Sequence, residues 1–474
     1  MGRLFGTDGV RGRAGEYPLD APTIRRLGAA LARALGDRGG GGVRFLAGRD
    51  TRESGPWIER ELAAAIGGEG GTLVSAGVIP TPAVAYLTPR MGYTAGVVIS
   101  ASHNPFEDNG IKVFAGSGEK FTEALEDRVE AIMADLPDLP PEGGSHTPEG
   151  GSHTAEGGSH TAAVASGLSR KSVEQIDYRP EYLDHLLRIL PSDHRQRGMR
   201  IAVDCANGAA TTVAPQLFER LGFDVRLIGD VPNGRNINLG CGSTAPELLA
   251  KTVVDGDCRL GLALDGDCDR AIFVDRHGRV VDGDAVLFLC AKQMKAEGRL
   301  RKNAIVATVM SNIGLEIGLR GAGIDLVRCP VGDKYVMDAL LTHGLSLGGE
   351  QSGHVIFADD LCTGDGLATS LHVLRTMAVT GRELDDLAGE LQTYPQVLLN
   401  VRVARRADLT TIPPVAAVLD DVGRRLAGQG RLLVRYSGTE PLLRIMLEGR
   451  DEAEIRRWAQ EIAEAVKRHL SVGT

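Results

Sequence analysis

The chain has 474 residues, of which 43% are hydrophobic and 24% charged, and its formal net charge is −9. This length predicts three or four domains, and the acidic balance disfavours nucleic acid or an anionic membrane as a partner, because both require a basic field. Seven cysteines without a paired CxxC spacing indicate neither a zinc ribbon nor a disulfide framework. The chain shows no apolar leader and no run of about 18 apolar residues, so we expect a cytoplasmic protein without a membrane segment.

The first section of the chain, up to about residue 135, alternates helix and strand patterns. Helices are expected over residues 22–35, 56–66 and 122–134, and strands over 43–47, 72–76, 96–99 and 111–114. Such alternation is typical of a mostly parallel sheet with helices on both faces.

A tandem repeat follows this section, reading PEGGSHT, PEGGSHT and AEGGSHT from residue 141 to residue 161. Glycine, serine and proline dominate it and large apolar residues are missing, so it cannot bury enough surface to offset its ordering entropy. Its three histidines, His146, His153 and His160, are at a spacing that would permit opportunistic metal binding, but we interpret the segment as a surface linker.

Two further sections repeat the helix and strand alternation, and the last one differs. Strands are expected at 200–204, 223–228 and 260–264 in the second section, and at 271–274, 304–308, 325–328 and 345–348 in the third. The last section, from about residue 384, has strands at 397–403, 432–436 and 443–448 and a final helix with Ile455, Trp458, Ile462, Ala465, Val466 and Leu470 on one face. The expected division is 1–136, a linker at 137–170, 171–264, 265–380 and 381–474.

One candidate site follows the apolar strand at 96–99, where residues 100–105 read SASHNP. A hydroxyl at the carboxyl end of a buried strand is held at the rim of the sheet, where open α/β folds bind ligands. Ser102 is the hydroxyl of interest, and His103 and Asn104 add polar groups beside it. An ordinary strand-to-loop turn has the same residue pattern, so this stretch alone does not distinguish a functional loop from a structural one.

A second stretch reads LGLALDGDCDR, in which another apolar strand leads to Asp265, Asp267 and Asp269. Three carboxylates within five residues repel one another unless a cation lies among them, and oxygen ligands of this kind suit Mg²⁺. An EF-hand loop is excluded because its glycine and glutamate positions hold Arg270 and Arg276. A solvated acidic turn is the alternative interpretation.

A third stretch, LVRYSGTEPLLR, lies near the end of the chain. Arg435 provides a guanidinium, Ser437 and Thr439 provide hydroxyls, and Gly438 exposes backbone N–H groups to an anion. These groups suit a phosphate, although a plain β-turn with a partly exposed arginine is the alternative.

Together these stretches resemble the α-D-phosphohexomutase superfamily, whose phosphoserine loop (T/S-A-S-H-N-P) and magnesium loop (D-G-D-x-D-R) they match in order. The opening LFGTDGVRG and the later GEQSGH are most similar to the members that act on glucosamine phosphates. The resemblance extends from residue 5 to residue 449. It implies three mixed-sheet α/β domains of similar topology, followed by a smaller α+β C-terminal domain.

The resemblance also implies a reaction. A phosphoryl group on Ser102 is given to one end of a sugar monophosphate, and the resulting bisphosphate turns over and returns its other phosphoryl group to the serine. The expected substrate is a hexosamine phosphate. Glucosamine 6-phosphate and glucosamine 1-phosphate interconvert through glucosamine 1,6-bisphosphate, and this interconversion feeds UDP-N-acetylglucosamine and cell-wall synthesis. Mg²⁺ is the expected cofactor, and a homodimer is a family expectation.

The residues that carry these roles by resemblance fall into three sets. The expected catalytic residues are Ser102, His103, Lys112, Arg11 and His354, with His354 or Lys112 as the acid/base. The expected metal ligands are Ser102, Asp265, Asp267 and Asp269. The expected substrate-binding residues are Arg270, Lys334, Glu350, Ser352, Arg435, Ser437, Gly438, Thr439 and Arg444.

Three alternatives stay open at this point. The same chemistry on mannose or glucose phosphates depends on only a few loop contacts. A serine hydrolase built on Ser102 and His103 lacks a G-x-S-x-G elbow and leaves the three aspartates unexplained. A non-catalytic sugar-phosphate binder would not require Ser102 together with all three aspartates. One departure from the family pattern is Cys268, which stands where relatives commonly have glycine; we expect its side chain to point away from the metal and the loop to be oxidation-sensitive.

Overall fold

The computed structural model describes residues 3–6, 8–36, 42–136, 173–437 and 441–470. The expected linker at 137–170, with its histidine repeat, lies outside the described residues, and so do Gly438 and Thr439.

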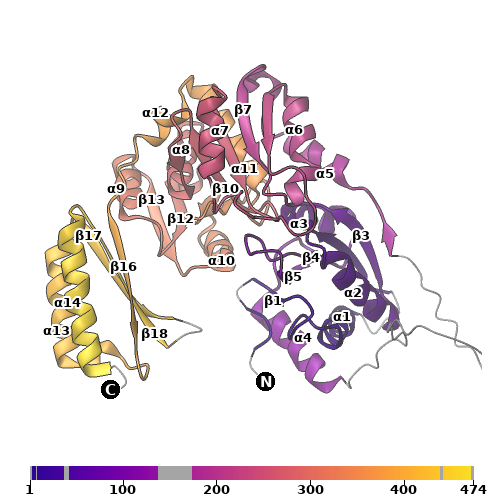
Figure 1. The fold of residues 1–474 in the computed structure, drawn as a ribbon, viewed down its shortest axis with the longest axis horizontal. Coiled ribbons are helices and arrows are strands. Elements are labelled where there is room, and N and C mark those ends of the chain that lie inside the picture. Colours follow the sequence, from indigo (N-terminus) through magenta and orange to yellow (C-terminus); the bar gives the residue numbers. More distant parts are fainter. Residues whose placement is uncertain (1–2, 7, 37–41, 137–172, 438–440, 471–474) are drawn as a thin grey trace, which may run out of the picture.

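The first unit is a six-stranded sheet in the order β1-β5-β4-β2-β3-β6 with four helices (Figure 1). Its elements are β1 (Val10–Arg13), α1 (Ala21–Leu35), β2 (Arg44–Arg49), α2 (Gly55–Gly68), β3 (Thr72–Val78), α3 (Thr81–Arg90), β4 (Ala95–Ile99), β5 (Asp108–Ala115), α4 (Glu123–Asp135) and β6 (Glu174–Gln175). The expected elements are confirmed, and β1, α3 and β6 are additional. The helix α3 has no polar stripe that would reveal it, because eight of its ten residues are buried.

The second unit is a five-stranded sheet in the order β11-β10-β9-β7-β8. Its elements are α5 (Arg179–Leu186), β7 (Arg200–Asp204), α6 (Ala214–Leu221), β8 (Asp224–Ile228), α7 (Glu247–Asp255), β9 (Leu260–Leu264), β10 (Ala271–Asp275) and β11 (Val280–Val281). The strand β10 was expected to begin the third section, but it pairs antiparallel with β9 and belongs to this second sheet. The expected boundary after residue 264 therefore separates two strands of one sheet.

The third unit is a four-stranded sheet in the order β13-β12-β14-β15. Its elements are α8 (Gly283–Ala296), β12 (Ala304–Thr308), α9 (Ile313–Gly321), β13 (Asp325–Cys329), α10 (Asp333–His343), β14 (Leu347–Gly349), β15 (Val355–Phe357) and α11 (Gly366–Thr380).

These three units share one topology. In each sheet a central strand (β2, β7 or β12) has parallel neighbours on both sides, and one of those neighbours (β4, β9 or β14) then pairs antiparallel with the next strand of the chain. The loops β4–β5, β9–β10 and β14–β15 therefore occupy equivalent positions. The expected mixed-sheet architecture is confirmed, and the remaining domain boundaries stay a prediction.

The last part of the chain forms a smaller α+β domain. Its elements are β16 (Gln396–Arg402), α13 (Pro413–Leu426), β17 (Gly430–Tyr436), β18 (Leu442–Gly449) and α14 (Glu452–Leu470). The short helix α12 (Leu384–Ala388) instead packs on α8 and buries Leu384 and Leu387 in the core of the first three units, so the expected boundary after residue 380 separates α12 from the unit on which it packs. The antiparallel sheet has the order β16-β18-β17, and α14 packs on it with Ile455, Ile462 and Val466 fully buried. The predicted apolar face of this helix is confirmed, with Trp458 partly buried.

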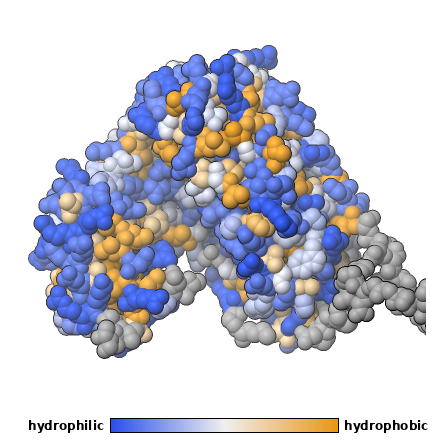
Figure 2. Space-filling view, viewed as in Figure 1, coloured by the Kyte–Doolittle hydropathy of each residue, from blue (hydrophilic) through white to orange (hydrophobic). Residues whose placement is uncertain are grey.

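The C-terminal domain has its own hydrophobic core, whereas one continuous core joins the first three units. In Figure 1 this domain lies beside the third unit, and Figure 2 shows the surface hollowed between it and the first unit. Among the described helices, none is long and apolar enough to cross a membrane.

Candidate active site

The three equivalent loops supply the central groups of the site. The β4–β5 loop carries Ser102, the β9–β10 loop carries the three aspartates, and the β14–β15 loop carries Glu350 and His354. The Ser102 hydroxyl donates to Asp265 Oδ2, and His354 Nδ1 lies 3.7 Å from Asp269 Oδ1. Side chains from three separate units thus meet in one place.

Ser102 is buried and strained. Its φ is +54°, in the left-handed region that non-glycine residues rarely adopt, and only 1% of its surface is exposed. His103 Nδ1 lies 3.4 Å from the Ser102 hydroxyl. Burial lowers the pKa of His103, and the nearby charges of Arg270 and Arg11 lower it further. His103 is therefore a neutral neighbour of the serine at neutral pH.

Two side chains that the sequence did not single out hold the Ser102 loop in this conformation. Arg52 is fully buried, forms an ion pair with Asp50 and donates to the carbonyl oxygens of Ser102 (3.2 Å) and Asn104. Asn238, from the second unit, donates to the same two carbonyls at 2.9 and 3.0 Å. Arg52 and Asn238 lie 50 and 136 residues from Ser102, so no local pattern could have revealed them.

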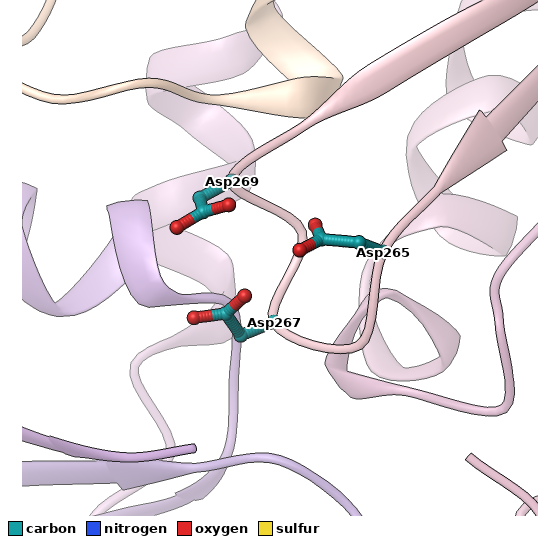
Figure 3. Close-up of side chains that lie close together, drawn as sticks. All are labelled: Asp265, Asp267 and Asp269. Atoms are coloured by element: carbon teal, nitrogen blue, oxygen red, sulfur yellow. The ribbon is translucent and has the colours of Figure 1, made fainter. Parts of the chain in front are cut away.

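The carboxylates of Asp265, Asp267 and Asp269 converge, with one oxygen of each within 4.8 Å of the others (Figure 3). All three are buried, and Oδ1 of Asp267 and Oδ1 of Asp269 have no hydrogen-bond partner within the described ranges. Burial, followed by the charges of Asp269 and Asp267, raises the pKa of Asp265 well above its usual range. Buried, unpartnered carboxylate oxygens that repel one another fit a divalent cation with oxygen ligands.

Lys112 faces the triad from β5. Its Nζ lies 2.8 Å from Asp267 Oδ2, 3.1 Å from Asp269 Oδ2 and 3.1 Å from Asp8 Oδ2. Burial lowers the pKa of Lys112, but the three carboxylates outweigh burial and raise it well above its usual value. The ammonium group therefore offsets part of the negative charge of the triad.

Cys268 points away from the aspartates, as expected. Its φ is +63°, which explains why glycine suits this position, and its side chain is fully buried in the core that joins the first three units. Burial raises the pKa of its thiol well above the usual value. The expected oxidation sensitivity is disfavoured, because reactive thiols are exposed and have lowered pKa values.

A cavity of about 400 Å³ opens beside the triad, with walls from all three α/β units. Its walls include Arg3, Leu4, Gly6, Asp8, Gly9, Arg11, Asp269, Arg270, Val331, Gly332, Asp333, Glu350 and His354. Arg11 pairs with Asp8, and Arg270 Nε lies 3.8 Å from Asp269 Oδ1. Buried Nε atoms of Arg11 and Arg270 have no hydrogen-bond partner among the residues described, so each retains a donor for an anion.

His354 is held rigidly at the edge of this cavity. The backbone N–H of Gly364 donates to its Nε2 at 3.1 Å, so the neutral ring carries its proton on Nδ1, toward Asp269. A side chain at Gly364 would lie 2.6 Å from the imidazole, so only glycine permits this packing. Burial lowers the pKa of His354, but Asp269 and Asp333 outweigh it and the net shift is upward.

Of the other expected sugar-binding residues in the third unit, Glu350 lines the cavity and Lys334 does not. Glu350 lines the cavity and accepts hydrogen bonds from the Gly332 N–H (3.0 Å) and the Ser352 hydroxyl (3.3 Å). Ser352 itself is exposed. Lys334 does not line the cavity; its Nζ lies 3.2 Å from Glu126 of the first unit. Lys334 thus bridges two units in this conformation.

The expected phosphate loop lies on the C-terminal domain, away from the cavity. Arg435 on β17 faces Arg444 on β18, and burial together with the Arg444 charge lowers the pKa of Arg435. Ser437 is buried at the end of β17. None of the described residues of this domain lines the cavity, so the two halves of the expected substrate site are apart here.

Comparison with known proteins agrees with this architecture. Four phosphoglucomutase/phosphomannomutase families match in order: alpha/beta/alpha domain I at residues 2–138, domain II at 180–278, domain III at 282–394 and the C-terminal domain at 398–465. The chain therefore belongs to the phosphoglucomutase/phosphomannomutase family.

Several proteins that match almost the whole chain are phosphoglucosamine mutases. A phosphoglucosamine mutase of Syntrophotalea carbinolica is 46% identical over 474 residues, which cover 100% of this chain and 99% of that protein. Among solved structures, a phosphoglucomutase/phosphomannomutase family protein of Burkholderia thailandensis has a TM-score of 0.77 at 23% identity, with 99% of both chains covered. An Aspergillus fumigatus N-acetylphosphoglucosamine mutase, solved with GlcNAc-6P and magnesium, has a TM-score of 0.65 at 19% identity, covering 98% of this chain and 95% of that one. These two structures establish the shared fold.

Proposed function

We propose that the protein is a phosphoglucosamine mutase, which interconverts glucosamine 6-phosphate and glucosamine 1-phosphate through a phosphoserine. The observation that carries this proposal is the Ser102 hydroxyl, held in a strained loop against Asp265 of the buried triad. Full-length similarity to phosphoglucosamine mutases supports the choice of the amino sugar.

Mg²⁺ is the proposed cofactor, and Ser102, Asp265, Asp267 and Asp269 are its proposed ligands. The unpartnered Oδ1 atoms of Asp267 and Asp269 support this assignment. When bound, the ion would neutralise charge on the transferring phosphoryl group. Asp265 accepts the hydroxyl hydrogen of Ser102 and so fixes where its oxygen points.

The cavity residues divide the remaining work. Arg11 and Arg270 present unpartnered guanidinium N–H groups to the reacting phosphate. Glu350, with Ser352 beside it, accepts hydrogen bonds from sugar hydroxyls, while Lys334 is a further proposed contact after it leaves Glu126. His354 carries a proton on Nδ1 and faces the cavity, whereas the Lys112 ammonium is bound by three carboxylates. This difference favours His354 over Lys112 as the acid/base. His103 is a polar neighbour of the serine.

The non-reacting phosphate is assigned to Arg435, Ser437, Gly438, Thr439 and Arg444. Since these residues belong to a domain that does not line the cavity here, the C-terminal domain has to approach the cavity when the sugar binds. Transfer to each end of the sugar then proceeds at one serine, with glucosamine 1,6-bisphosphate turning over between the two transfers. We further propose that the protein is a cytoplasmic homodimer and that its reaction supplies the precursor of UDP-N-acetylglucosamine for cell-wall synthesis.

Peptide mapping by mass spectrometry tests this function. The purified protein is expected to carry phosphate on the Ser102 peptide and to turn over glucosamine 6-phosphate with Mg²⁺. Ser102→Ala should lose both the phosphate and turnover, whereas Ser117→Ala, on an exposed turn of the same unit, should keep them. No phosphate after incubation with a hexose bisphosphate, together with no turnover of any hexose phosphate, would contradict the proposal. Faster turnover of mannose or glucose phosphates than of glucosamine 6-phosphate would contradict the proposed sugar specificity.

A further inference from the structure

The junction between the third unit and the C-terminal domain contains an arginine cluster that the proposed mechanism does not use. Arg431, on β17, donates from Nη2 to the carbonyl oxygen of Ser311 at 2.9 Å, and its Nε lies 2.7 Å from Glu448 on β18. Arg328, on β13, donates from Nη1 to the same Ser311 carbonyl at 3.0 Å. One backbone oxygen thus receives guanidinium groups from both sides of the junction.

The next residue holds the connecting segment itself. Asn312 donates from its side chain to the Tyr394 carbonyl at 2.9 Å and accepts from the Tyr394 N–H at 3.0 Å. At Gly314 a side-chain carbon would lie 2.0 Å from the Gln392 carbonyl oxygen, so only glycine lets α9 pack this closely on the connection. The turn at Ser311 and Asn312 therefore holds the C-terminal domain at two points: the connecting segment at Tyr394 and the domain itself at Arg431.

Two points of attachment restrict the motion of a rigid domain more than a single point does. A single hinge lets a domain swivel freely, whereas two contacts confine it to rotation about the line that joins them. The buried surroundings strengthen both contacts: Ser311 and Glu448 are 0% exposed and Asn312 is 5% exposed. Figure 1 shows the C-terminal domain beside α9 and β13, where this turn lies.

Arg431 connects this attachment to the proposed phosphate loop. Arg431 and Arg435 lie on the same strand, four residues apart, and therefore on the same face of the sheet. This is the face opposite Val397, Ile445 and Leu447, which pack under the helices. The orientation of Arg431 at one end of β17 thus sets the direction in which Arg435 and Ser437 are presented at the other.

We propose that the Ser311–Asn312 turn is the pivot of the C-terminal domain and that Arg431 is a positioning residue for the phosphate-binding loop. The expected change in KM rests on the proposed function, whereas the attachment of the C-terminal domain at this turn does not. A loop that binds the non-reacting phosphate alike in the ground state and the transition state contributes to KM rather than to kcat.

The test compares Arg431→Lys with Arg425→Lys. A lysine at 431 keeps a positive charge beside Glu448 but loses the forked reach to Ser311, whereas Arg425 lies on α13 and pairs within its own domain, with Asp421 and Glu461. We expect Arg431→Lys to raise KM for glucosamine 6-phosphate about tenfold, the cost of one charge-assisted hydrogen bond, with kcat and phosphorylation of Ser102 retained. Arg425→Lys should have the same KM, kcat and Ser102 phosphorylation as the wild type.

Small-angle X-ray scattering of the same proteins without substrate provides the structural readout. The interatomic-distance distribution of Arg431→Lys should broaden relative to wild type and Arg425→Lys, because the domain swivels on one contact. If Arg431→Lys is unstable, Arg431→Gln combined with Glu448→Gln removes both charges and serves in its place. A superimposable distribution overturns the pivot, and a broadened one with unchanged KM overturns the positioning role. An inactive wild type would instead refute the proposed function, while the scattering would still decide the pivot.

Discussion

Replacing Lys112 with methionine tests the electrostatic balance of the candidate metal site. At an effective dielectric constant of about 20, an ammonium about 3 Å from a carboxylate gains roughly 5.5 kcal/mol, and Lys112 has three such partners at 2.8–3.1 Å. Desolvation of the buried groups offsets much of this gain, so removing one member of a buried ion cluster costs about 3–5 kcal/mol. The Lys112→Met variant should therefore be markedly less stable than the wild type in the presence of a chelator.

Mg²⁺ should restore part of this loss. The ion and the Lys112 ammonium neutralise the same carboxylates, so the variant gains more from the ion than the wild type does. At a hundred times its dissociation constant, a ligand that binds only the folded state stabilises it by about 2.7 kcal/mol. Lys112→Met should also be inactive or nearly so.

Thermal unfolding with EDTA and with a Mg²⁺ titration measures both effects. Lys251→Met is a matched control, because Lys251 is an exposed lysine paired with Asp255 one helical turn away. This control should differ from the wild type by less than about 0.5 kcal/mol. The reasoning is refuted if Lys112→Met melts with the wild type in EDTA, or if Mg²⁺ raises both melting temperatures equally.

Two further predictions concern residues near the site and at a unit interface. Burial lowers the pKa of His185, stacked on Tyr86, from 6.5 to about 4. The folded state thus binds fewer protons than the unfolded one, and its stability should fall by up to about 3 kcal/mol between pH 6.5 and pH 4. His185→Phe should flatten this fall in denaturant titrations at each pH; an unchanged slope would contradict it. Gly266→Ala would place a carbon 2.5 Å from the Ser102 carbonyl oxygen, so phosphorylation of Ser102, measured by intact mass, should slow at least tenfold; a wild-type rate would show that the loop adapts.

Much of the fold could be read from the sequence because its elements are local patterns. The strands at 96–99 and 260–264, and the turn-forming residues after them, predicted both site loops before any contact was known. The sequence did not predict the helix α3, because a helix buried on all sides has no polar stripe. It also did not predict that β10 pairs with β9, because an apolar run does not reveal its pairing partner.

The sequence by itself determined which groups are present: one serine at a strand end, three alternating aspartates, and an arginine with hydroxyls near the chain end. Only the tertiary structure decided that Ser102 meets Asp265 across 163 residues, that Arg52 and Asn238 hold its loop, and that Lys334 pairs with Glu126 rather than facing the cavity. The physical reason is that side-chain chemistry and backbone propensity are properties of a residue and its neighbours. Charge balance, burial and hydrogen-bond partnership at a site depend instead on which distant segments the packed core brings together.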